Sequence, residues 1–68
     1  MDSNLEKSVY KIFLPRTPRG ESMVVEPTGQ TRFTGLWPSV KLGFNLMVNN
    51  HPVKVYYRGV EVLTFKEK

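Results

Sequence analysis

The chain has 68 residues, 40% of them hydrophobic, and carries ten lysines and arginines against six acidic residues, for a formal net charge of +4. This length and apolar fraction indicate one small globular domain, and they argue against two domains and against wholesale disorder. With no cysteine and a single histidine, neither a disulfide framework nor a Cys/His zinc site supplements the small core. A second copy or a protein partner would add to its marginal stability.

The N-terminal residues carry no apolar signal segment, and no run of the sequence approaches the 18 apolar residues of a membrane span. We therefore expect a soluble, cytoplasmic protein without a membrane partner. Residues 1–7 and 66–68 are expected to be flexible tails on either side of one domain that spans residues 8–65.

Strands are favoured along the whole domain. Alanine is absent, and β-branched and aromatic residues make up about a third of the chain. Prolines and glycines recur at short intervals and leave no long helical window. The first expected strands are residues 8–14, 22–26 and 31–34, separated by a basic loop at 15–20 and a turn at 27–30.

A central strand is expected over residues 40–48, where apolar residues alternate with others, and Gly43 within it is the expected place of a bulge or bend. Residues 53–57 and 60–65 then form a hairpin around Arg58 and Gly59. The predicted core contains Leu42, Phe44, Leu46, Val55 and Val62.

Sequential short strands with tight turns predict an all-β fold of five or six antiparallel strands. Closure into a small barrel, SH3-like or OB-like, would remove the exposed edges of such a sheet. A two-layer β-sandwich is the alternative architecture.

Catalysis has little support in the sequence. The single histidine, His51, lies in a polar turn without a nearby nucleophile, and the carboxylates are scattered along the chain. No phosphate-binding glycine motif or calcium loop is present. We therefore expect a protein that is not an enzyme, with no cofactor, no metal and no small-molecule substrate.

Cations and aromatic rings are interleaved on two of the expected strands. Lys54, Tyr56 and Arg58 lie opposite the valine face of the hairpin, and Lys11 and Phe13 share one face of the first strand. Cations neutralise phosphates while rings stack on bases, which is how small β-barrels bind single strands. In the alternative interpretation, the cations only solubilise an outer face and the rings close one end of the core.

We expect the prolines of the loop at 15–20 to hold Arg16 and Arg19 extended, because each residue before a proline is restricted to β or polyproline II geometry. Such a loop suits a groove of nucleic acid, although an ordinary mobile loop has the same composition. These two arginines complete the predicted nucleic-acid-binding set.

Leu36 and Trp37 lie between Gly35 and Pro38, in an expected surface turn. They are candidates for a protein interface or a homodimer contact, and in the alternative interpretation Trp37 folds inward as a lid on the core. The favoured function is nucleic-acid binding on a basic and aromatic outer face. The alternative is a protein-interaction module, a regulatory inhibitor or a small subunit of a larger complex.

Overall fold

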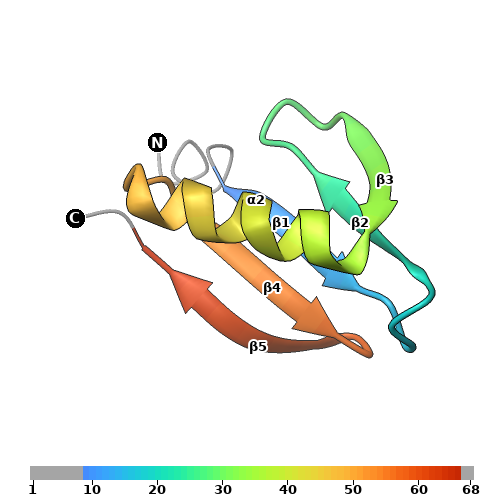
Figure 1. The fold of residues 1–68 in the computed structure, drawn as a ribbon. Coiled ribbons are helices and arrows are strands. Elements are labelled where there is room, and N and C mark those ends of the chain that lie inside the picture. The colour runs from blue at the N-terminus through green and yellow to red at the C-terminus, as the bar shows by residue number, and fades with distance from the viewer. Residues whose placement is uncertain (1–8, 67–68) are drawn as a thin grey trace.

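The computed structural model describes residues 9–66, which form a five-stranded sheet crossed on one face by a single helix (Figure 1). The predictions for residues 1–7 and for the last two residues lie outside the described part of the chain. The elements in chain order are β1 (Tyr10–Leu14), β2 (Glu21–Val25), β3 (Thr31–Gly35), α2 (Leu36–Val48), β4 (Val53–Tyr57) and β5 (Val60–Phe65).

The strand order in the sheet is β3-β2-β1-β4-β5, and its central pair, β1 with β4, is parallel. The other neighbouring pairs are antiparallel. Two parallel strands need a long crossover, and here it runs through β2, β3 and α2. Except for residues 40–48, the predicted strands are present within one or two residues of their expected bounds, and the mostly β class is confirmed.

The barrel and the sandwich are both wrong. β3 and β5 lie at opposite edges of the sheet and do not pair, so the sheet stays open. A sandwich would need a second sheet, but the second layer within residues 9–66 is the helix α2 (Figure 1). Once β4 joins β1 in parallel, the antiparallel meander that both architectures assume cannot form.

Residues 36–48 are a helix, so the predicted strand at 40–48 is wrong. Pro38 is tolerated because it lies in the first turn, where the backbone N–H of a residue has no intrahelical acceptor. Ser39, Gly43 and Leu46 are buried, and their spacing of four and three residues is the period of a helix that packs on one side. The apolar alternation in this segment therefore coexists with a helical pattern of small and apolar residues.

The core lies between α2 and the three central strands. Ile12, Val24 and Val53, from β1, β2 and β4, are buried against Leu46 of the helix. Gly43 is in the helix rather than at a strand bulge, and a Cβ built there would lie 3.2 Å from Cδ1 of Ile12. The lack of a side chain at Gly43 thus allows the helix to pack closely on the sheet.

The core prediction is partly confirmed. Leu46 is buried, and Leu42 and Val55 pack against the core as half-buried residues. Phe44 is 65% exposed because it lies on the outer side of α2. Val62 is exposed because it lies at a register shift in the edge strand β5, where the alternation of faces is broken.

Candidate nucleic-acid interface

The sheet has one face under the helix and one face that no other element in residues 9–66 covers. We call the second one the open face. Strand register assigns side chains to it, because partners on neighbouring strands point to the same side of a sheet. Its main members, on β1 to β4, are Lys11, Phe13, Met23, Phe33, Lys54 and Tyr56.

Two lysines lie side by side on the open face. Lys11 of β1 and Lys54 of β4 are register partners in the parallel pair. Neither forms an ion pair with any residue in the described range 9–66. Two neighbouring ammonium groups repel each other, and an anion bound between them would remove that repulsion.

An aromatic pair lies next to the two lysines. Phe13 and Tyr56 are also register partners. Each lies two residues after the lysine of its own strand, a distance of about 7 Å along the strand. Their rings are stacked, with centroids 4.8 Å apart and planes 13° apart. Parallel rings at this separation are offset, so neither ring fully covers the face of the other.

The aromatic pair is extended across β2 and β3. Met23 is the register partner of Phe13, and Phe33 is the partner of Met23. Phe33 is 65% exposed at the edge of the sheet. Together these four side chains form an apolar row across the open face, which we call the aromatic row: Phe33, Met23, Phe13 and Tyr56.

The three predicted arginines lie at one end of the sheet. Because β1 and β4 are parallel, the loop after β1 and the turn after β4 leave the sheet at the same end (Figure 1). Arg16 and Arg19 are exposed in that loop. Arg58 is exposed in that turn, with its guanidinium carbon 5.8 Å from the centroid of the Tyr57 ring. All seven predicted nucleic-acid-binding residues are therefore carried by β1, β4 and the connections that follow them.

Acidic side chains mark the limits of this basic region. Glu61 of β5 is the register partner of Tyr56, at one end of the aromatic row, and its carboxylate accepts a hydrogen bond from the Thr64 hydroxyl. Glu21 lies on the same face at the start of β2. The positive charge is therefore concentrated along the central parallel pair.

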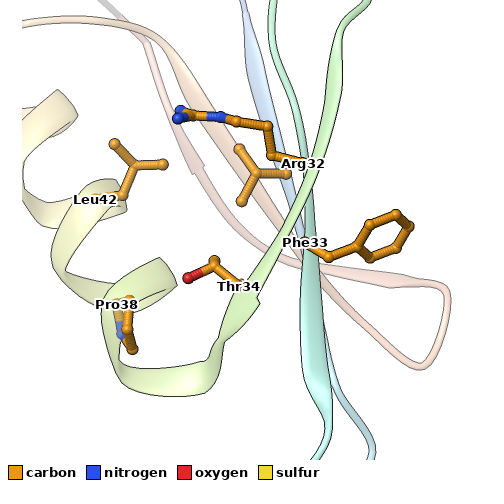
Figure 2. Close-up of a pocket in the computed structure, with 6 residues that line it drawn as sticks. Arg32, Phe33, Thr34, Pro38 and Leu42 are labelled. Carbon is orange, nitrogen blue, oxygen red and sulfur yellow. The ribbon is translucent and has the colours of Figure 1, made fainter.

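Met23 and Phe33 are two members of the open face that the sequence did not single out. Figure 2 shows Phe33 pointing away from the helix, while its neighbours Arg32 and Thr34 point toward it. In the sequence, only the alternation of side-chain direction along residues 31–35 indicated which face of the sheet Phe33 lies on. This alternation identifies Phe33 as a member of the open face only once the register of β2 with β3 is known, because that register aligns Phe33 with Met23.

A groove lies on the helix side of the sheet, between β3 and the first half of α2 (Figure 2). It has a volume of about 350 Å³ and contains one charged side chain, Arg32, whose Nε lies 2.9 Å from Oε2 of Glu26. Because this cation already has a carboxylate partner, we assign no ligand to the groove. Its lining comes from Val24, Arg32, Phe33, Thr34, Pro38 and Leu42.

Leu36 and Trp37 form the first turn of α2 rather than a surface turn between strands. Leu36 is half-buried, whereas Trp37 is 71% exposed, so Trp37 is not a lid on the core. The exposed ring leaves the predicted interface role open.

Between residues 9 and 66, no three acidic or histidine side chains gather at a distance suited to a metal ion. His51 is exposed just beyond the helix. Of the helices in this range, none is long and apolar enough to cross a bilayer.

Comparison of the chain with protein-family models, curated proteins and solved structures gave no significant match.

Proposed function

We propose that the protein binds single-stranded nucleic acid on the open face of its sheet. One observation carries the proposal: the parallel register sets Lys11 beside Lys54 and Phe13 beside Tyr56, on a face that no other described element covers. Phosphates would bind the lysines, and an unpaired base would continue the stack of the two rings.

A single strand suits this surface better than a duplex. The bases of a single strand can turn toward a ring, whereas those of a duplex are already stacked on one another. On each of the two central strands a lysine is followed by a ring two residues later, as a phosphate is followed by a base along an extended single strand. Arg16, Arg19 and Arg58 would contact the backbone where it leaves the sheet.

The proposal is tested by fluorescence anisotropy with labelled oligothymidylate and oligouridylate and with a duplex of equal length. Phosphate contacts make affinity fall with salt, with a slope of about −0.7 per contact for single strands. We expect the double variant Lys11→Gln/Lys54→Gln to bind more weakly and to lose about 1.4 from the magnitude of that slope.

The matched control for charge is Lys41→Gln with a second neutral substitution, Arg32→Gln, since Lys41 lies on α2 and Arg32 points to the helix side. This control also removes two positive charges, but from the side of the sheet that the helix covers. Equal weakening by both double variants would mean that net charge alone drives binding, and it would overturn the proposed site.

The stacking contribution is tested separately with Tyr56→Ala and Tyr56→Leu. Removal of a stacking ring costs about 1–3 kcal/mol of binding free energy. Tyr56→Leu keeps apolar bulk beside Phe13, so both variants should bind weakly while Tyr56→Leu stays folded in a denaturant melt. A wild-type protein that binds no oligonucleotide at low salt would overturn the proposed function.

A further inference from the structure

The outer side of α2 carries a line of exposed apolar side chains. Positions 37, 40, 44 and 48 are three, four and four residues apart, so they lie on one side of the helix. Trp37 and Val48 are each 71% exposed, Phe44 is 65% exposed and Val40 is also exposed. We call these four residues the outer stripe. It lies opposite the buried positions Ser39, Gly43 and Leu46.

We propose that the outer stripe is the contact surface of a homodimer, in which α2 packs antiparallel against α2 of a second copy. This inference is independent of nucleic-acid binding, because α2, whose outer side carries the stripe, covers the face of the sheet opposite to the open face (Figure 1).

The size of the exposed surface fits a second copy. Side chains of these types, exposed to this extent, present on the order of 500 Å² per copy, which is at the upper end for a patch left bare on a monomer. Two copies together would bury about 1,000 Å², the lower bound for a specific protein–protein contact. The expected dimer is therefore weak and depends on protein concentration.

The charge of the helix also fits a second copy. Lys41 is the one charged residue between Leu36 and Val48, and it lies at one border of the outer stripe, four residues after Trp37 and three before Phe44. A single cation gives the surface no charge pattern by which to select an oppositely charged partner. The four apolar side chains of the outer stripe can be matched by those of an identical copy, as a twofold contact requires, while the long side chain of Lys41 extends from the border of the contact into solvent. Within the sequence of residues 1–8, Met1 and Leu5 are the only large apolar residues, which are too few to match the four of the outer stripe.

The shape of the stripe favours the antiparallel arrangement. It begins with the large ring of Trp37 and ends with the small side chain of Val48. An antiparallel pair sets each Trp37 against Val48 of the other copy, which gives an even spacing between the helices. A parallel pair would set two large rings together at one end and two valines at the other, and it would also align the helix dipoles unfavourably.

The test is sedimentation of the full chain between about 1 µM and about 1 mM, the range in which a contact of this size associates. We expect wild type to shift from monomer to dimer. Phe44→Lys should raise the dissociation constant at least tenfold, because it sets a charge at the centre of the contact. Thr28→Lys is the matched control: it adds the same charge in the exposed β2–β3 turn and should leave association unchanged.

Trp37 is the only tryptophan, so it reports directly on its own surroundings. Its emission should shift to the blue and become protected from iodide as the concentration rises. A nitroxide attached at Asn49→Cys, next to the stripe, should quench Trp37 of the other copy in the antiparallel dimer. It should not do so within one chain, where about 18 Å of helix separates the two positions.

Several results would overturn the proposal. A monomer at every concentration would do so, as would a dimer that Phe44→Lys leaves intact. Protection of Trp37 in the dilute monomer would show that the same chain covers the stripe. A dimer without nitroxide quenching would contradict the antiparallel arrangement. Circular dichroism of Phe44→Lys and of a milder variant, Phe44→Ala, distinguishes loss of association from loss of fold.

Discussion

Ser39 joins the helix to the sheet through a single hydroxyl group. Its Oγ lies 2.6 Å from the carbonyl oxygen of Leu36, to which it donates, and 2.8 Å from Oγ of Ser22. A hydroxyl has only one proton to donate, so the Ser22 hydroxyl is the donor in the bond between the two serines. Both residues are fully buried. The Ser22 hydroxyl depends on Ser39 as its acceptor, whereas the Ser39 hydroxyl has the Leu36 carbonyl as a second partner.

The two alanine substitutions should consequently differ in cost. Ser39→Ala leaves the buried Ser22 hydroxyl without an acceptor, which costs about 1–3 kcal/mol of unfolding free energy. Ser22→Ala leaves Ser39 still bonded to Leu36, so it should cost about 0.5–1.5 kcal/mol. Urea melts of both variants measure the difference. Equal costs, or a larger cost for Ser22→Ala, would contradict the assigned direction of the bond.

At the residue scale, the sequence predicted exposure well in strands and poorly in the helix. The alternation in β1 and β4 correctly separated the buried Ile12 and Val53 from Lys11 and Lys54. The same rule, applied to residues 40–48, assigned Phe44 to the core. Because the backbone there is helical, Phe44 lies instead a full turn from Val40 on the outer side, and its truncation should cost far less stability than that of Leu46.

At the scale of elements, α2 depends on its small residues. Gly43 faces Ile12, and even a Cβ would approach Cδ1 to 3.2 Å. We expect Gly43→Leu to destabilise the protein by about 1–3 kcal/mol through overpacking, despite the gain in helix propensity. The matched control is Asn45→Leu, an exposed position of the same helix, which should change stability by less than about 0.5 kcal/mol.

Thermal or urea unfolding at a concentration too low for association measures both variants. If Gly43→Leu were as stable as Asn45→Leu, the helix would not pack as closely on the sheet as this geometry requires. A stabilised Gly43→Leu would mean that propensity outweighs the contact with Ile12.

The helix was hard to predict because its local signals conflict. Pro38 and Gly43 are poor helix formers in isolation, no alanine is present, and apolar residues alternate from Val40 to Val48. What favours the helix is tertiary: Ser39 and Gly43 fit closely against the sheet, and their burial is visible only when the sheet exists. The hairpin of β4 and β5, in contrast, has a local signal, and its turn residues Arg58 and Gly59 adopt φ values of 55° and 78°, the left-handed pair that such turns require.

At the scale of the whole molecule, stability should be graded across the sheet. β1 and β4 have a neighbour on both sides and lie under the helix, whereas β3 and β5 each have one neighbour. Native-state hydrogen exchange should therefore be slowest for the ladder amides of β1 and β4, which open only with global unfolding. Ladder amides of β5, where Val60, Val62 and Leu63 are exposed, should exchange through local opening. Equal protection in β5 and β1 would contradict this gradient.

The candidate site depends on a strand pairing that could not be predicted from the sequence. Local alternation identified Lys11 with Phe13 and Lys54 with Tyr56 as two separate basic and aromatic faces. Their union into one surface depends on the parallel pairing of β1 with β4, between segments far apart in the chain, for which no local pattern exists. Met23 and Phe33 join the surface through the antiparallel registers of β1 with β2 and of β2 with β3.

The central parallel pair also affects how the protein is made. β1 leaves the ribosome before its partner β4, which follows only after β2, β3 and α2 have been synthesised. During that interval one edge of β1 has no strand beside it, and an unpaired edge is a site for association with other chains. A nascent chain that stalls after α2 would hold the future centre of the sheet exposed as an edge. Synthesis of β4 and β5 therefore converts this edge into the most protected part of the molecule.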